Sequence, residues 1–230
     1  MAVAQGMRET RGALARWNRD PAPVLRAWML GSFAFAAGLL LAVLGIALVA
    51  TPDLTPVWLP GVAYPAGVDD YLAVIWRNGL VLALHAVACV AGFIAGSALP
   101  LQAGSMTGWR RWIHEQARPL AFAWVVAVTG FSLITQAFVL GSVGAQLAEQ
   151  FQISPVVLVL TVAPHALLEL TAVFLPLAAW TIASRRDEWN ELLAATLVTV
   201  VIAIPMLIVA SAWENLVWPQ LLELASPALG

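Results

Sequence analysis

The sequence has no lysine, one cysteine and few charged residues, and each scarcity excludes a class of protein. Charged residues make up 10% of the 230 residues, whereas soluble domains carry about a quarter, so the chain cannot cover itself with a soluble surface. The single cysteine, Cys89, cannot form an intrachain disulfide, and its apolar neighbours predict a buried thiol. No basic cluster interleaved with aromatic residues is present, so we expect no nucleic-acid partner.

Hydrophobic residues are abundant instead. They make up 61% of the chain, and the mean hydropathy is +0.86. Several apolar runs reach the roughly 20 residues that a helix needs to cross a bilayer. We therefore predict an all-α integral membrane protein with about five transmembrane helices, over residues 24–50, 80–99, 119–140, 156–184 and 192–213.

Arginine supplies all the positive charge and alternates from loop to loop. Five arginines lie before or at the start of the first span, three lie between the second and third, and two lie between the fourth and fifth. The loops 51–70 and 141–155 and the tail after Pro219 contain none. Because positive residues favour the cytoplasmic side, we predict a multi-pass protein of the bacterial cytoplasmic membrane with a cytoplasmic N-terminus and an external C-terminus.

Three regions follow from this topology. Residues 1–23 are expected to be a cytoplasmic segment that lies on anionic lipid or binds a partner; residues 24–219 form the helical membrane domain, and 220–230 an external tail. The proline-containing loop 51–69 predicts an ordered external cap. Tryptophan near both predicted boundaries indicates aromatic belts, with Trp17, Trp28, Trp109, Trp112, Trp180 and Trp189 on the inner side and Trp58, Trp76, Trp213 and Trp218 on the outer side.

Two features predict helix breaks at Gly79 and Pro164. Glycine is a poor helix residue by about 1 kcal/mol relative to alanine, and proline removes a backbone donor. We therefore predict short interfacial or re-entrant helices at about 71–77 and 156–162.

With such breaks, residues 70–142 and 155–215 would form a two-fold parallel internal repeat, with its axis along the membrane normal. Two long tilted helices with kinks are the alternative.

His165 and Glu169 are the most informative residues, because they lie four apart in an apolar span and hence on one helical face. An ionisable pair at membrane depth predicts a functional site. Opposite charges at similar depth are expected to face each other, since each alone is costly to bury. The predicted polar intramembrane cluster consists of Arg77, Asn78, Gln136, His165, Glu169 and Glu214.

Other residues are predicted to serve packing. Gly92 and Gly96 form a small-xxx-small motif, which suits close helix contacts within one chain or between copies. His85 is expected to be a buried packing residue whose polar atoms are satisfied.

Three motifs resemble the stage II sporulation protein M family over roughly residues 65–220. They are Arg77-Asn78-Gly79 before a span, Ala163-Pro-His-Ala-Leu-Leu-Glu169, and Ala212-Trp-Glu214 with Pro219 following. The family shows an asparagine-rich turn, a Pro-His-Gly-x-x-Glu-type motif and a late glutamate followed by proline; here Gly79 replaces the second asparagine and Ala166 replaces the motif glycine. The resemblance implies a multi-spanning bacterial envelope protein, with relatives that work with peptidoglycan-remodelling partners or accompany peptide export.

Three functions fit these observations. The first is a non-enzymatic cell-envelope scaffold with a buried Arg/His/Glu cluster, whose partners are the lipid bilayer and other envelope proteins or further copies of itself. The second is a transporter or exporter component for an ion, lipid or peptide that uses His165 and Glu169 in the outer half of the membrane. The third is a metal-dependent hydrolase, but the sequence lacks the His-Glu-x-x-His motif that would favour it. We expect no enzyme activity, cofactor or metal.

Overall fold

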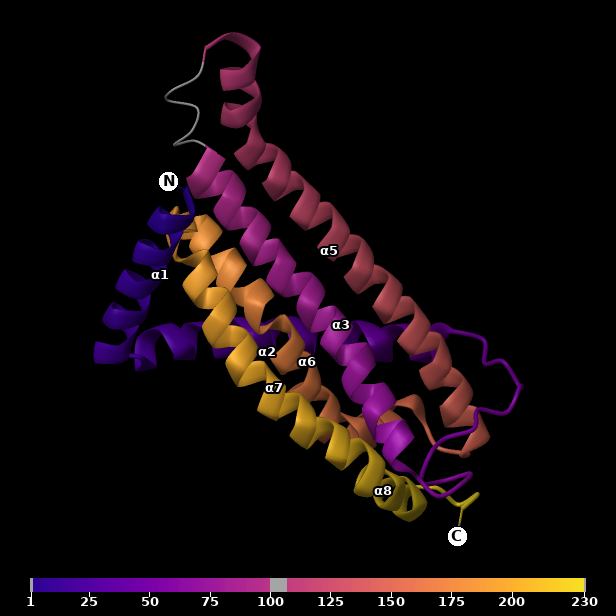
Figure 1. Cartoon of the computed structure of the whole chain (residues 1–230). Coiled ribbons are helices and arrows are strands. Elements are labelled where there is room, and N and C mark those ends of the chain that lie inside the picture. The colour runs from indigo at the N-terminus through magenta and orange to yellow at the C-terminus, as the bar shows by residue number, and fades with distance from the viewer. Residues whose placement is uncertain (1, 100–106, 230) are drawn as a thin grey trace.

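The computed structural model describes residues 2–99 and 107–229 as a bundle of long helices (Figure 1). Five of them are long and apolar enough to cross a membrane, as the sequence predicts. The helices are α1 (Ala2–Arg19), α2 (Ala22–Val49), α3 (Val68–Phe93) with the π-helical η1 (Ile94–Ala98), α5 (Gly108–Gln150), α6 (Pro155–Arg186), the 3-10 turn η2 (Trp189–Glu191), α7 (Leu192–Leu216) and α8 (Trp218–Ala225). Across the described residues, the all-α fold is confirmed.

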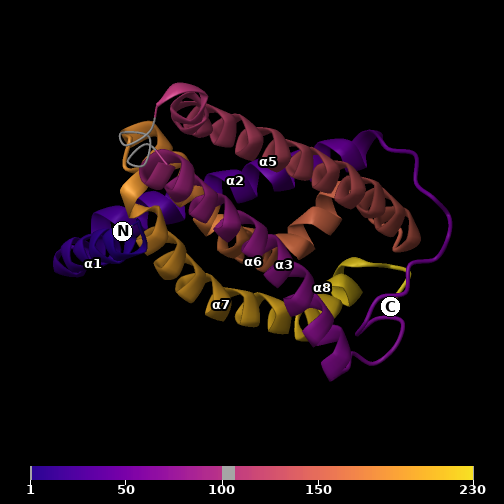
Figure 2. The same cartoon turned by 45° about the horizontal axis from the view of Figure 1, so that its top comes forward.

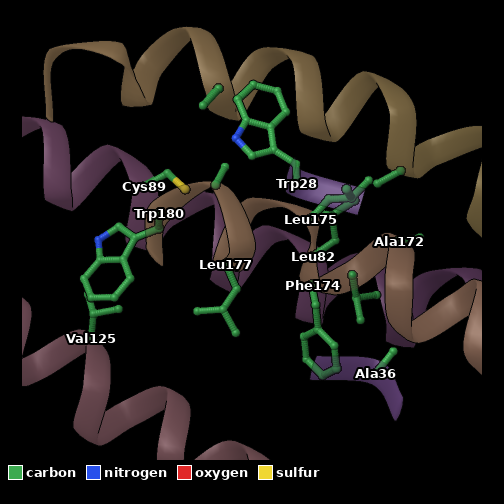
Figure 3. Close-up of a cluster of buried hydrophobic side chains, with 14 of the residues drawn as sticks. Trp28, Ala36, Leu82, Cys89, Val125, Ala172, Phe174, Leu175, Leu177 and Trp180 are labelled. Carbon is green, nitrogen blue, oxygen red and sulfur yellow. The ribbon is translucent and has the colours of Figure 1, made fainter. Parts of the chain in front are cut away.

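Helix α6 is the centre of the bundle. Every residue from Thr171 to Trp180 is buried, and α2, α3 and α7 surround this stretch (Figure 2). A helix that is apolar and buried all round is typical of the core of a helical bundle. Figure 3 shows Phe174, Leu175 and Trp180 of α6 among the core side chains, with Leu82 of α3 nearby.

Helix α5 lies at the edge of the bundle. It packs mainly on α2, and its other face leaves large apolar side chains exposed, among them Trp124, Phe131 and Phe138. In a membrane this face is suited to contact with lipid tails.

Local signals set both ends of α6. The Ser154 hydroxyl accepts a hydrogen bond of 3.2 Å from the Val157 amide, and Pro155 occupies the first turn, where its missing N–H costs nothing. At the other end Asp187 takes a left-handed conformation with φ 63°, and Arg185 and Arg186 lie in the last turn. Positive charge there is favourable with the helix dipole. We call the end of the bundle with Pro155 the outer end and the end with Arg186 the inner end, after the predicted topology.

The predicted helix breaks at Gly79 and Pro164 are wrong. Helix α3 continues through Gly79, and α6 continues through both Pro164 and Pro176. Residues 71–77 and 156–162 are therefore continuous with the spans that follow them. Backbone groups freed by a break would lack partners in an apolar medium, whereas one glycine or one missing donor costs far less.

The packing also gives no support to the predicted internal repeat. Helices α6 and α7 share a long interface, whereas α3 and α5 meet over a short one. Since the two predicted halves are packed differently and contain no short leading helix, two long continuous helices describe the chain better.

Polar side chains from neighbouring helices bind backbone carbonyls of α6 near Pro176. The Ser32 hydroxyl of α2 donates to the Thr171 carbonyl at 2.5 Å, and His85 Nδ1 of α3 lies 3.0 Å from the Val173 carbonyl. The Cys89 thiol donates to the Pro176 carbonyl at 3.1 Å. His85 is 1% exposed, so it is the satisfied packing residue that the sequence predicts, and the Cys89 thiol is buried as expected.

The loop between α2 and α3 is an ordered cap over the outer end. The Gln150 side chain forms two hydrogen bonds with the Val57 backbone, at 2.8 Å to its amide and 3.0 Å to its carbonyl. Val57, Leu59 and Val62 pack onto a second core cluster that includes Trp218 and Leu222. The predicted order of this loop is thereby confirmed, and its external location stays a prediction.

The chain termini differ from the predicted regions in detail. The boundary placed after Pro219 divides α8, which packs on α6 and α7 and buries Leu222 completely. The C-terminal residues are thus part of the helical body. At the inner end, α1 meets α2 at a bend and packs on α7 and η2 (Figure 1).

The tryptophans are divided between surface and core. Trp58, Trp76, Trp109, Trp112 and Trp213 are exposed, as belt residues should be, whereas Trp28, Trp180, Trp189 and Trp218 are buried. These four indoles fill space between helices of the bundle, and their depth in a membrane stays a prediction.

Candidate functional site at the outer end

Four of the six predicted cluster residues line one pocket at the outer end of the bundle. Arg77 comes from α3, His165 and Glu169 from α6, and Glu214 from the last turn of α7. The pocket has a volume of about 250 Å³. The four side chains come from three helices, so only the tertiary structure brings them together.

Arg77 and Glu214 form a loose ion pair across the mouth of the pocket. Arg77 Nη2 lies 3.9 Å from Glu214 Oε1, and the Arg77 side chain is 68% exposed. At this distance and exposure, the pair has the geometry of a surface salt bridge, which stabilises a protein by about 0–1 kcal/mol.

His165 lies deeper and is incompletely satisfied. It is 5% exposed, and its Nδ1 has no hydrogen-bond partner. Its ring lies against the indole of Trp218, with 5.7 Å between the ring centroids. The indole nitrogen of Trp218 donates to the Thr161 hydroxyl at 3.3 Å, so Trp218 is held by α6 while it covers the histidine. Buried polar atoms without a partner are rare in folded proteins, and such an atom beside a pocket suits a ligand or a water molecule.

Glu169 lies one helical turn below His165 and faces the same pocket. No ion pair within 4 Å involves Glu169 among the residues that the structure describes. Asn78, Arg77 and Glu214 are its polar neighbours. Its carboxyl group therefore lies among polar side chains without a close ion pair.

The remaining walls are aliphatic. Apolar side chains from α2, α5 and α6 and Leu59 of the cap also line the pocket. The pocket is thus amphipathic, because its lining combines ionisable groups with hydrocarbon. Its formal charge, with one arginine, two glutamates and a neutral histidine, is −1.

Gln136 and Asn78 do not line this pocket. Gln136 is on α5, where its amide donates to the Ser132 hydroxyl one turn away at 2.9 Å. Asn78 is buried beside Glu169, and its Nδ2 has no partner at hydrogen-bonding distance. The depth argument made Gln136 a member of the cluster but could not specify which way α5 faces.

Gly92 and Gly96 lie at contacts within the chain. A β-carbon on Gly92 would lie 2.8 Å from Leu192 Cδ1, and one on Gly96 would lie 2.4 Å from Trp189 Cγ. The small-xxx-small motif therefore lets η2 and the start of α7 pack closely on α3 and η1. These contacts within one chain explain the two glycines without a second copy of the protein.

Sequence reasoning missed two parts of the pocket. Trp218 was assigned to the outer aromatic belt, and Leu59 belongs to a loop with no apolar periodicity. The spacing of Glu214 and Trp218, four apart across the junction of α7 and α8, is the signal that could have indicated a shared face.

Metal-ligand geometry is not found in the described part of the chain. No group of three or more histidine, cysteine, aspartate or glutamate side chains converges there closely enough to hold a metal ion. His165, Glu169 and Glu214 thus share a pocket without forming a metal-ligand set.

One of three comparisons with known proteins gave a match. Residues 117–219 match the sequence model of the family described as Stage II sporulation protein M, which confirms the predicted resemblance. The matched stretch contains His165, Glu169 and Glu214, while the Arg77 motif lies before it. Neither the comparison with curated proteins nor the comparison with solved structures gave a match.

Proposed function

We propose that this membrane protein, which matches the Stage II sporulation protein M family over residues 117–219, is a transport component that binds an ion or one end of an amphipathic cargo in the outer pocket. One observation carries the proposal: the pocket reaches both His165 and Glu169, and the buried His165 Nδ1 has no hydrogen-bond partner. A cluster that served only to hold helices together would be expected to satisfy its own polar atoms.

The size and lining of the pocket support a limited range of cargo. Its volume of about 250 Å³ is close to the lower end of the roughly 300–1,000 Å³ of small-molecule sites. It therefore suits a cation, or a short part of a larger lipid or peptide. The negative lining favours a positively charged group, and the aliphatic wall favours an attached apolar group.

His165 and Glu169 are suited to carry a proton during such a cycle. An imidazole and a carboxyl group can each bind and release a proton, and the two side chains lie one turn apart on the same helix face and line the same pocket. In this proposal the protein transports without chemical conversion, so it has neither enzyme activity nor a cofactor.

A cell-envelope scaffold is the second candidate. The observation that favours it is the Arg77–Glu214 pair, because two of the four ionisable side chains already neutralise each other in part. Its partners would be other envelope proteins at the outer end of the bundle.

Glu169→Gln separates the two candidates. The amide keeps the size of the side chain but cannot ionise. If the carboxyl group acts in transport, the variant should keep its thermal stability. It should lose the proton uptake that an imposed membrane potential drives into proteoliposomes containing the wild-type protein. If the carboxylate is structural, unfolding should become easier by about 1–3 kcal/mol, because its buried polar neighbours lose a charged acceptor.

Access to the pocket gives an independent measurement. Ala166 lines the pocket, so a cysteine there, with Cys89 replaced by alanine, should react with an impermeant thiol reagent added from outside. A cysteine at Ala172, which is fully buried in α6, is the matched control and should not react. An unreactive Ala166→Cys variant together with an unstable Glu169→Gln variant would leave the scaffold as the better proposal.

A further inference from the structure

The inner end of the bundle contains a second pocket, separate from the outer one. Its volume is about 370 Å³, and it lies between α1, α2, the last turns of α6 and η2. The outer pocket uses the first half of α6, whereas this one uses Ala179 to Glu188. The two pockets are thus at opposite ends of the same central helix.

Small side chains leave the space open. Ala179, Ala183 and Ala195 form part of the wall, and all three are buried. The indoles of Trp17 and Trp28 form another part, packed edge to face with 5.1 Å between the ring centroids. A pocket walled by alanine and tryptophan offers an apolar surface near the predicted membrane boundary, where tryptophan is common.

Charged side chains of both signs surround the opening. Arg16 is already paired with Glu191. Arg186, Asp20 and Glu188 also line the pocket, and in the part of the chain that the structure describes none of these three forms an ion pair within 4 Å. One guanidinium group and two carboxylates are therefore left to act on a ligand.

This arrangement favours a ligand that is itself a zwitterion. A phosphate would bind the Arg186 guanidinium through charge-assisted hydrogen bonds, and a primary ammonium would donate to the carboxylates of Asp20 and Glu188. An anionic headgroup without an ammonium would meet two unpaired carboxylates for one cation. A quaternary ammonium has no N–H to donate.

We propose that the inner pocket binds the phosphoethanolamine headgroup of a zwitterionic membrane phospholipid, with Arg186 on the phosphate and Asp20 and Glu188 on the ammonium. The lipid is the favoured source because the pocket lies beside α1, whose Arg8, Arg11 and Arg19 are exposed. A basic segment is attracted to the anionic surface of a membrane, which would bring the pocket next to lipid headgroups. The bound lipid would join α1 to the ends of α2 and α6.

The test uses the full chain purified in detergent, with lipid binding followed by native mass spectrometry. Phosphatidylethanolamine, phosphatidylglycerol and phosphatidylcholine with identical acyl chains are titrated in turn, and soluble glycerophosphoethanolamine is added as a competitor. We expect phosphatidylethanolamine to bind most tightly, and we expect the soluble headgroup to displace it only weakly because it lacks the apolar contacts.

Arg186→Gln and Arg185→Gln form a matched pair. Both arginines are exposed in the last turn of α6, but only Arg186 lines the pocket. Arg186→Gln should weaken phosphatidylethanolamine binding by about tenfold or more, as expected for hydrogen bonds to a charged group, and Arg185→Gln should leave binding unchanged. Glu188→Gln should reduce the preference for phosphatidylethanolamine over phosphatidylglycerol.

Three outcomes would overturn the proposal. Equal losses in the two arginine variants would mean general attraction to lipid, and equal or tighter binding of phosphatidylglycerol would contradict the zwitterion. Binding of the soluble headgroup as tightly as the lipid would exclude a lipid as the source. Because the arginine variants change only exposed side chains, a failure to fold does not confuse the result.

Discussion

Gly96 and Trp189 are in such close contact that no side chain fits between them: a β-carbon on Gly96 would lie 2.4 Å from Cγ and 2.5 Å from Cδ2 of the indole. Gly96 is in the π-helical turn at the inner end of α3, and Trp189 begins the 3-10 turn before α7. The Trp189 indole nitrogen donates to Asp187 Oδ1 at 2.9 Å, so the ring cannot easily move away. This contact fixes how closely α3 approaches the junction between α6 and α7.

Gly96→Ala should therefore destabilise the protein by about 1–3 kcal/mol, the usual cost of overpacking a core. Gly45→Ala on α2 is the matched control, because a β-carbon there meets nothing within 4 Å. It should be neutral or stabilising by up to about 1 kcal/mol. Thermal unfolding in detergent measures both effects. Similar effects in the two variants would show that a β-carbon at residue 96 fits without a clash.

Arg77→Leu should lower stability only slightly, because the Arg77 side chain is 68% exposed and lies 3.9 Å from its partner. We expect a coupling energy with Glu214→Gln of about 0.2–1 kcal/mol in a double-mutant cycle. Denaturant unfolding of the wild type, both single variants and the double variant gives this value. A coupling of several kcal/mol would mean that Arg77 and Glu214 form a closer ion pair than the 3.9 Å contact. Strictly additive losses of stability would mean that the two residues do not interact.

The topology predicts which positions react with an impermeant thiol reagent in intact cells. With Cys89 replaced by alanine, a cysteine at Ala63 in the cap or at Leu224 in α8 should react from outside, since both positions are exposed. A cysteine at Asn190, exposed at the inner end, should react only after the cells are opened. Labelling of Asn190→Cys in intact cells would reverse the orientation.

Tyr64 should titrate at higher pH than an ordinary tyrosine. Its hydroxyl donates a hydrogen bond of 3.0 Å to Asp70 Oδ1, and this bond to a carboxylate raises the pKa of Tyr64 above the usual 10.0, since ionisation would place two negative charges side by side. With Tyr71→Phe in place, Tyr64 is the remaining tyrosine of the two in the chain, and its absorbance can be followed alone.

Asp70→Ala should return the pKa of Tyr64 toward its usual value, while Asp69→Ala should leave it raised. The two aspartates lie side by side in the first turn of α3, so the comparison controls for general charge. An unchanged titration after Asp70→Ala would show that the cap does not bind the start of α3 in solution.

Properties that depend on local sequence were predicted well. The five spans follow from the length and apolarity of each run, because a helix satisfies its backbone hydrogen bonds within itself. The shared face of His165 and Glu169 follows from helix geometry alone. The buried thiol of Cys89 and the packed state of His85 were likewise expected from the apolar runs that contain them.

Properties that depend on which helix faces meet required the tertiary structure. Nothing local indicates that Gln136 bonds within α5 while Trp218 covers His165, because rotation of a helix about its axis is decided by packing against its neighbours. The continuity of α3 through Gly79 and of α6 through Pro164 has the same origin: packing and an apolar medium stabilise an unbroken helix by more than one unfavourable residue costs. The sequence by itself thus determined that this chain forms five apolar helices with ionisable groups in three of them, and the packing of those helices around α6 decided that the groups line a pocket.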